Sequence, residues 1–315
     1  MRAIGFDEPG GPEVLAEIEV PQPQAGPGEV RLRVEAATVN PSDLVTRSGR
    51  AHDRYRDVTA PYVPGWDAAG VVEQAGPGSG WRVGDRVVAV TRPVVDGGGA
   101  YAEYIVVPDD SVARIPDGVD SVAAATLPMN GLTAHLALDA LGPASGRVIA
   151  VTGAAGAVGG YAIQLAAHAG YTVVADAAPA DRQLVTDLGA DVVVERGNDV
   201  AHRIRDHYPG GVDAVVDGAL LGADVLAAIR DDGAYVALRP PVLTGGVESE
   251  RGIGVHYVMV TDHVRDGAAL RELSDLAGQG VLSLRVARTF PAERAADAHR
   301  LLESGGLRGR VVLTF

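Results

Sequence analysis

The sequence predicts an α/β protein in which a small antiparallel barrel or sandwich is combined with a doubly wound parallel sheet. Two patterns of apolar residues in the sequence predict this combination. Residues 28–90 contain short apolar alternations broken by Gly and Pro, which is typical of antiparallel strands joined by turns. From about Asp120, Val- and Ala-rich runs alternate with helical patterns, which indicates a parallel sheet covered by helices on both faces. The final residues show the first pattern again, so we expect the parallel-sheet domain to be inserted between two parts of the other domain.

The same two patterns predict the domains and the order of their elements. A length of 315 residues suits two domains, and the change of pattern predicts one domain from residues 1–118 and 265–315 and another from 119–264. After residue 264 we expect a helix, a strand over 282–290, a helix from Ala292 to Leu302 and a final strand. In the inserted domain, helices separate five expected strands: 147–152, 171–176, 191–194, 212–217 and 234–238.

The composition excludes several classes of function. The formal net charge is -14, and no cluster of Lys and Arg offers a surface to a polyanion, so we expect no nucleic-acid partner. The absence of cysteine removes disulfides, thiolate metal ligands and a cysteine nucleophile. The start of the chain lacks a signal-peptide pattern, and no run of about 18 apolar residues occurs. We therefore expect a cytoplasmic protein that does not associate with membranes.

A glycine-rich run, AVTGAAGAVGG at residues 150–160, predicts a dinucleotide site. Gly153, Gly156 and Gly159 are spaced three apart between an expected strand and an expected helix. Such a turn brings the backbone close to a pyrophosphate and directs the N–H groups of the helix start toward it. The flanking strand, the helix and the second strand over 171–176 favour this interpretation over an ordinary buried helix start.

The end of the second strand bears on the choice of coenzyme. An acidic residue there accepts hydrogen bonds from the ribose of NAD, whereas NADP sites place neutral or basic groups there. Counting forward from Gly170 places Ala177 at this end, while counting back from Gly189 places Asp176 there. Arg182 and Arg196 follow, either as partners of a 2′-phosphate or as solvated surface charges. At this stage both coenzymes remain open.

Seven further segments carry a resemblance to a known family over essentially the whole chain. They are MRAIGFDEPGGPEVL, ATVNPSDL, PYVPGWDAAGVV, GDRVVAV, GGAYAEYIVVP, LPMNGLTAH and the ending RTFPAERAADAHRLLESGGLRGRVVL. With the glycine run, they make the chain resemble the zinc-independent quinone oxidoreductases, the zeta-crystallin-like group of the medium-chain dehydrogenase/reductase superfamily. The resemblance implies a GroES-like β-barrel domain built from both chain ends, a Rossmann domain inserted between them, and an active site in the cleft between the two.

The resemblance also bears on metal binding and on the reaction. Zinc-using members carry Cys near the position of Asn40 and Gly-His-Glu where this chain has Gly65-Trp66-Asp67. Tetrahedral zinc lacks its usual ligands here, so we expect no metal. Alcohol oxidation needs a group that stabilises an alkoxide, whereas a quinone or enone accepts hydride readily. The expected function is therefore metal-independent hydride transfer to a quinone or another activated α,β-unsaturated carbonyl.

The family pattern then implies the site residues. Asn40 and Asp43 match an Asn-Pro-x-Asp segment at the nicotinamide end, although Asn-Pro and Ser-Asp are also good turn formers. Thr133 matches a Thr near the nicotinamide, and a role at a helix start is the alternative for it. These three are the expected catalytic residues. Arg182 and Arg196 match positions that face the 2′-phosphate, so we choose NADPH over NADH. The expected coenzyme-binding residues are Asn40, Asn130, Thr133, Gly153, Ala155, Gly156, Ala157, Val158, Gly159, Asp176, Ala177, Arg182, Arg196, Gly218, Ala219, Ala237 and Arg239.

Alternative functions and the assembly state complete the expectations. Enoyl-thioester reductases of the superfamily place a proton-donating Tyr where this chain has Ala51, which makes such a reductase, or a biosynthetic tailoring reductase, the alternative enzyme. A protein of another class would bind NADPH without turnover, as a sensor or a structural protein. Residues 252–260, GIGVHYVMV, are expected to form a last strand with an exposed edge, which relatives pair across a twofold axis. We therefore expect a homodimer.

Overall fold

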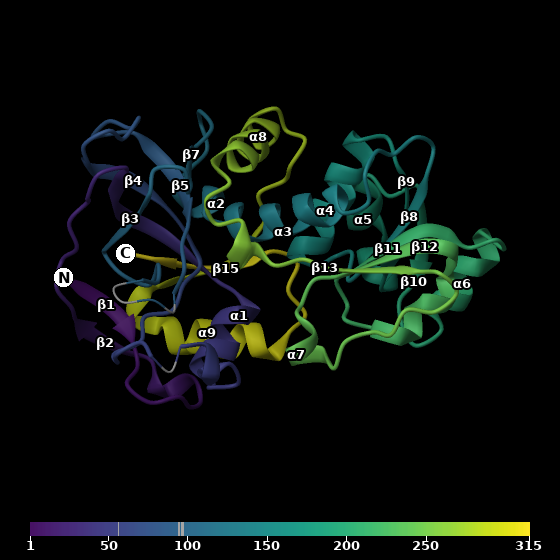
Figure 1. The fold of residues 1–315 in the computed structure, drawn as a ribbon, viewed down its shortest axis with the longest axis horizontal. Coiled ribbons are helices and arrows are strands. Elements are labelled where there is room, and N and C mark those ends of the chain that lie inside the picture. Colours follow the sequence, from purple (N-terminus) through teal and green to yellow (C-terminus); the bar gives the residue numbers. More distant parts are fainter. Residues whose placement is uncertain (56, 94, 96–97) are drawn as a thin grey trace. The chain divides into compact units, whose positions relative to one another are not determined.

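The computed structural model describes residues 1–55, 57–93, 95 and 98–315 and divides the chain into two compact units (Figure 1). The first unit is Met1–Met129, Thr261–Gln279 and Leu284–Phe315, and the second is Asn130–Val260 and Gly280–Ser283. The second unit thus interrupts the first along the chain. The boundaries expected from the sequence, at 118/119 and 264/265, stay a prediction, while the α/β class is confirmed. Among the described residues, no helix is both long and apolar enough to cross a membrane.

The first unit is built on a sheet whose strands pair antiparallel, except for one parallel pair at its edge. In β3 the residues Val30, Leu32 and Val34 alternate with more exposed ones, so one face of the strand enters the core. β1 (Arg2–Gly5) and β2 (Ala16–Glu19) form a separate antiparallel pair. The main sheet has the order β14 (Val286–Pro291), β15 (Arg310–Thr314), β3 (Glu29–Val39), β4 (Asp67–Ala75), β5 (Arg86–Val90) and β7 (Val112–Arg114), and β6 (Tyr104–Pro108) also pairs with β3.

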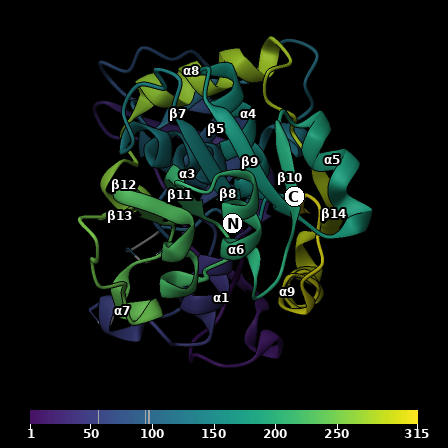
Figure 2. The same cartoon turned by 90° about the vertical axis from the view of Figure 1, so that its right-hand side faces the viewer.

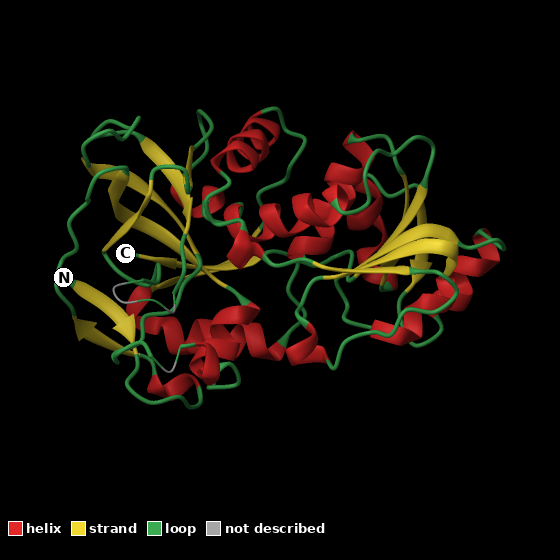
Figure 3. Ribbon diagram, viewed as in Figure 1, coloured by secondary structure: helices red, strands yellow, loops and turns green. Residues whose placement is uncertain are grey.

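The first unit also contains helices, drawn red in Figure 3. Their caps and buried faces explain their positions in the sequence. α2 (Ser121–Ala124) begins at Asp120, whose side chain accepts the N–H of Ala123, and α8 (Gly267–Gly278) begins in the same way at Asp266. α9 (Ala295–Ser304) buries Ala295 and Ala298 in the core of the sheet, and His299 is also buried on this helix. α1 (Pro41–Arg47) follows β3 directly. The expected helix over 292–302 is thus present, with a 3-10 turn as its first three residues.

The second unit contains a parallel sheet with the order β10, β9, β8, β11, β12, β13 (Figure 2). The strands are β8 (Val148–Thr152), β9 (Thr172–Ala177), β10 (Val192–Glu195), β11 (Val212–Asp217), β12 (Ile229–Ala237) and β13 (Gly254–Tyr257). The order reverses between β8 and β11, and in open α/β sheets ligands bind outside the carboxyl ends of the strands at such a point. The helices are α4 (Ala157–His168), α5 (Arg182–Asp187), α6 (Val200–His207) and α7 (Pro241–Thr244); α3 (Pro128–Asp139) spans the boundary of the two units.

The expected strands of the second unit are all present, but the last one is shorter than predicted. β13 comprises Gly254–Tyr257 and pairs in parallel with β12 as its neighbour in the sheet. Gly252 has a φ of +73° in the turn that precedes it, and a 3-10 turn over Val260–Asp262 follows. These turns at both ends shorten the strand to less than half of the expected range.

Candidate functional site

The glycine-rich turn joins β8 to α4, and its three glycines do different things. Gly153 has a φ of +63°, and a Cβ there would lie 2.8 Å from the carbonyl carbon of Gly218. A Cβ on Gly159 would lie 2.3 Å from the oxygen of Gly153, so the helix can touch the turn only through a glycine. A Cβ on Gly156 would meet one atom, the oxygen of Gly153 at 3.0 Å. Backbone packing thus requires Gly153 and Gly159 most strictly.

The start of α4 is suited to an anion. Gly156 is its N-cap residue and carries no side chain, and Ala157, Val158 and Gly159 form the first turn. Amides of a first helical turn have no partner within the helix, and the helix dipole adds positive potential there. Ala155 precedes the helix in the same turn. The expected phosphate-binding residues therefore lie together at one helix start.

Three strand ends meet beside this turn. In the sheet register, Thr152 of β8 pairs with Asp217 of β11, which pairs with Ala237 of β12. Gly218 and Ala219 follow Asp217, and the N–H of Ala219 donates to Thr152 Oγ1 at 3.1 Å. Arg239 lies two residues beyond Ala237. The structure therefore places these sequence-predicted residues at the carboxyl edge of the sheet, where ligands of such sheets lie.

A buried polar cluster that the sequence analysis missed holds this edge. The Thr152 hydroxyl donates to Asp217 Oδ1 at 2.6 Å, and the Tyr235 hydroxyl donates to Asp217 Oδ2 at 2.8 Å. Asp217 is fully buried, and its Oδ2 also accepts the N–H of Gly222 at 2.9 Å. Burial, and then the Asp217 charge, raise the pKa of Tyr235, so its hydroxyl stays a donor. A carboxylate at the end of an apolar strand is the signal that could have revealed this cluster.

The structure resolves the choice between Asp176 and Ala177. Ala177 is the last residue of β9, and Asp176 precedes it. The carboxylate of Asp176 is 7% exposed and accepts the N–H of Ala154 at 3.1 Å, so it fixes the glycine-rich turn. Burial raises the pKa of this carboxyl. Asp176 is therefore engaged by the turn, and an uncharged residue ends the strand.

The two arginines expected at the 2′-phosphate lie beyond this strand end. The N–H of Arg196 donates to the oxygen of Ala177 at 3.0 Å, which places Arg196 beside the end of β9. Arg182 is the first residue of α5, and its Nη1 donates to the oxygen of Val193 at 2.9 Å. Both arginines are exposed. The remaining expected residues of this unit, Asn130 and Thr133, lie one turn apart on α3 and are 6% and 8% exposed.

In the first unit, Asn40 belongs to a buried network rather than to an isolated turn. Its Nδ2 donates to Asp67 Oδ1 at 3.0 Å, and its Oδ1 accepts from Arg310 Nη2 at 2.7 Å. Asp67 is fully buried, lies 3.8 Å from Arg310 Nη2, and also accepts the Thr38 hydroxyl and the N–H of Met129. The network joins β3, β4, β15 and the start of α3. The sequence analysis did not find Thr38, which is close to Asn40 in the sequence but belongs to no motif. It also did not find Arg310, which lies 270 residues from Asn40 in the sequence.

Asp43 occupies the third position of α1 and binds two backbone amides. Its Oδ2 accepts the N–H of Asn40 at 2.8 Å, and its Oδ1 accepts the N–H of Gly65 at 2.9 Å. The side chain has no exposed surface, and burial raises the pKa of Asp43 to about 7. Gly65 has a φ of +105°, and a Cβ there would lie 2.7 Å from the Ala100 nitrogen. Asp43 thus fixes two backbone segments against each other.

The segment that carries zinc ligands in zinc-using relatives has a different composition and different contacts here. Trp66 is 7% exposed, and its neighbour Asp67 is bound by Arg310 and Asn40. In the part of the chain that the structure describes, no group of three or more His, Cys, Asp or Glu side chains is placed to hold a metal ion.

Comparison with known families defines the class of protein. Residues 26–117 match the model of the alcohol dehydrogenase GroES-like domain, and residues 188–313 match the zinc-binding dehydrogenase model. Together with the parallel sheet and its glycine-rich turn, these matches define a medium-chain dehydrogenase/reductase. The GroES-like and Rossmann-like parts expected from the sequence are therefore confirmed.

Individual relatives narrow this class. A chloroplastic quinone oxidoreductase of Triphysaria versicolor is 36% identical over 99% of this chain and 98% of its own length. A chloroplastic NADPH-dependent alkenal/one oxidoreductase of Arabidopsis thaliana is 32% identical over 99% of this chain and 79% of its own. A mycobacterial protein solved in complex with NADPH superposes with a TM-score of 0.84 at 32% identity, with both chains fully covered. The chain belongs to the quinone oxidoreductase family of the medium-chain dehydrogenase/reductase superfamily.

Proposed function

We propose that this protein transfers a hydride from NADPH to a quinone or another activated α,β-unsaturated carbonyl compound, without a metal ion. The observation that carries the proposal is the glycine-rich turn at the reversal point of the parallel sheet, in a chain of the quinone oxidoreductase family. When bound, NADPH supplies the hydride from its nicotinamide ring. The protein then has to hold the coenzyme and orient the acceptor.

The glycine-rich turn supports coenzyme binding by its shape and its charge. Gly153 and Gly159 let the turn pack closely against the backbone around it, and the first turn of α4 directs amides toward the pyrophosphate. Asp176 is engaged by the turn, so it does not present a free carboxylate to a 2′-phosphate. Arg196 beside the end of β9, together with Arg182, supplies charge-assisted hydrogen bonds for that phosphate. These contacts favour NADPH over NADH.

The residues expected to be catalytic divide into two roles. Asn40 and Asp43 are buried, and their polar atoms are used within the first unit, so we assign them as positioning residues. Asn130 and Thr133 on α3 are assigned to the nicotinamide. Gly218, Ala219, Ala237 and Arg239, at the carboxyl edge of the sheet, are assigned to the wall of the coenzyme site.

A turnover assay tests the proposed reaction. Purified protein should oxidise NADPH faster with 1,4-benzoquinone or 9,10-phenanthrenequinone than without an acceptor, and EDTA should not change the rate. Rates across a panel of quinones, enones and an enoyl thioester rank the acceptors, and an enoyl thioester as the best substrate would favour the alternative enzyme. NADPH binding by calorimetry with no turnover on any acceptor would instead favour a binding protein.

A second experiment tests the coenzyme. Arg182→Ala combined with Arg196→Ala should weaken NADPH binding by about 10- to 100-fold, because each lost charge-assisted hydrogen bond is worth roughly 1.5–3 kcal/mol before solvent screening. NADH, which lacks the 2′-phosphate, serves as the matched control ligand and should bind the variant as it binds the parent. Equal losses for both coenzymes would show that the phosphate lies elsewhere.

We also infer a homodimer and a cytoplasmic location. β13 is the last strand in the sheet order, and among the described residues no strand pairs with its outer edge. We expect that edge to pair with a second copy. Light scattering at micromolar concentration should give twice the mass of one chain, and a monomer would remove the dimer. The location is supported by the composition and is tested by fractionating cells of the source organism.

A further inference from the structure

The hydroxyl group of Tyr101 lies between two buried side chains from distant parts of the first unit. It is 3.1 Å from Nε2 of His299, on α9, and 3.5 Å from Oδ2 of Asp43, on α1. None of these three side chains has exposed surface. A hydroxyl carries one proton, so it can donate to only one of its two neighbours at a time.

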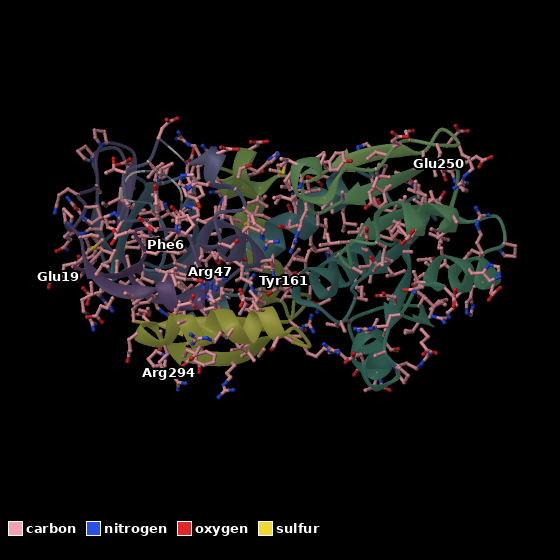
Figure 4. All side chains as sticks on the ribbon, turned by 90° about the horizontal axis from the view of Figure 1, so that it is seen from below. Phe6, Glu19, Arg47, Tyr161, Glu250 and Arg294 are labelled. Atoms are coloured by element: carbon pink, nitrogen blue, oxygen red, sulfur yellow. The ribbon has the colours of Figure 1, made fainter. Side chains whose placement is uncertain are left out.

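The surroundings of His299 keep its ring neutral. Burial, and then the charge of Arg47, lower the pKa of His299 to about 3. Arg47 is itself buried on α1 and pairs with Glu303 of α9 at 2.5 Å; Figure 4 labels Arg47 beside this yellow helix. A neutral imidazole carries one proton, on either Nδ1 or Nε2. The contact with Tyr101 therefore decides which nitrogen carries it.

The direction of the hydrogen bonds depends on the charge of Asp43. When Asp43 is ionised, its carboxylate is the stronger acceptor and takes the proton of Tyr101, so the Tyr101 oxygen accepts from an Nε2–H of His299. When Asp43 is protonated, it donates to Tyr101, which then donates to a bare Nε2. The two directions of these hydrogen bonds thus correspond to two tautomers of His299.

We propose that Tyr101 and His299 are positioning residues of the candidate site. Their hydrogen bonds run from His299 Nε2–H through the Tyr101 hydroxyl to Asp43, and they keep Asp43 in the form that accepts the amides of Asn40 and Gly65. This assignment deepens the proposed function and rests on it for its kinetic effect. Neither residue touches the coenzyme or the acceptor in this role.

The other charged groups around Asp43 act in opposite senses. Asp67 of β4 raises the pKa of Asp43, while Arg310 of β15 and the two backbone amides lower it. Burial outweighs these amides and the arginine, so the carboxyl titrates near neutral pH. A further donor such as Tyr101 therefore shifts the balance between the protonated and ionised forms of Asp43 near neutral pH.

Nuclear magnetic resonance of the whole protein tests the direction of these hydrogen bonds without requiring turnover. With ¹⁵N-labelled histidine, one of the eight histidine signals should vanish in His299→Gln and identify His299. At pH 8.5 this residue should be the neutral Nε2–H tautomer. A neutral Nδ1–H tautomer or a charged ring at that pH would overturn the proposal, whether or not the protein reduces quinones.

Kinetics test the positioning role. For Tyr101→Phe, the ratio of kcat/KM to that of the parent should fall about tenfold at pH 6 and return to near one at pH 9.5. This is the effect of raising the midpoint of Asp43 by about one pH unit through loss of one donor. Tyr55→Phe is the matched control, because Tyr55 lies in the same core and donates its hydroxyl to the oxygen of Thr46 at 2.6 Å. Its ratio should not change with pH, and a pH-independent ratio for Tyr101→Phe would overturn the proposal.

Discussion

Replacing Gly159 by alanine should separate α4 from the glycine-rich turn. The new Cβ would lie 2.3 Å from the oxygen of Gly153 and 2.9 Å from the Cα of Ala154, whereas ordinary contacts begin at 3.4 Å. Because both neighbours are backbone, no rotamer change relieves the overlap, and the turn and helix have to move apart by about 1 Å. Such overpacking costs about 1–3 kcal/mol, while alanine returns up to about 1 kcal/mol of helix propensity.

The net loss of stability from Gly159→Ala is therefore about 0–3 kcal/mol. NADPH should nevertheless bind about 10- to 100-fold more weakly, because the amides that face the phosphates are displaced. Fluorescence titration with NADPH gives the affinity, and urea unfolding gives the stability. Gly210→Ala is the matched control, since a Cβ there has no atom within 4 Å, and NADPH should bind it as the parent. Parent-like affinity for Gly159→Ala would refute the assignment of this turn.

Two further predictions concern buried polar groups. Asp43 binds its proton more tightly when folded, because burial raises its pKa from 3.8 to about 7, so the unfolded chain releases the proton first and stability falls as the pH rises through this window. Between pH 5 and pH 8 the free energy of unfolding of the parent should therefore fall by about 2–3 kcal/mol. In urea unfolding at several pH values, Asp43→Asn should not show this fall. A parent-like fall would assign the titration to another group. Tyr235→Phe removes the donor to Asp217 at 2.8 Å and should cost about 1–2 kcal/mol of stability in thermal unfolding; an unchanged unfolding midpoint would contradict this role of Tyr235.

The local patterns of the sequence were sufficient to predict the fold of the second unit. A strand, a spaced set of glycines and a helix follow one another within residues 147–168, so their roles depend on neighbours in the chain. The same holds for the alternation of strands and helices. The shortened β13 differs because turns at both of its ends, one at a glycine of positive φ, interrupt a mostly apolar run.

The buried networks depended on contacts that no local pattern contains. Arg310 donates to Asn40 across 270 residues of sequence, and Tyr101 meets His299 across 198. Strand register identifies the residue that ends β9. Pairing of β9 with β10 places Ala177 opposite Glu195 and leaves Asp176 one residue inside the strand. A one-residue difference in register changes which side chain points to each face of a sheet, so counting from flanking glycines could not resolve it.

Burial of Asp43 has two opposite effects. Its ionisation lowers the stability of the folded protein, and the ionised carboxylate orders the backbone at the candidate site. Ionising this buried carboxyl in the folded chain costs about 4 kcal/mol relative to the unfolded chain, since its pKa lies roughly three units above 3.8. An apolar side chain would avoid that cost but could not bind the amides of Asn40 and Gly65, which come from separate segments. The protein should therefore be less stable above pH 7, where both amides have a full carboxylate partner, than near pH 5. An activity optimum on the alkaline side of the stability optimum follows from this arrangement.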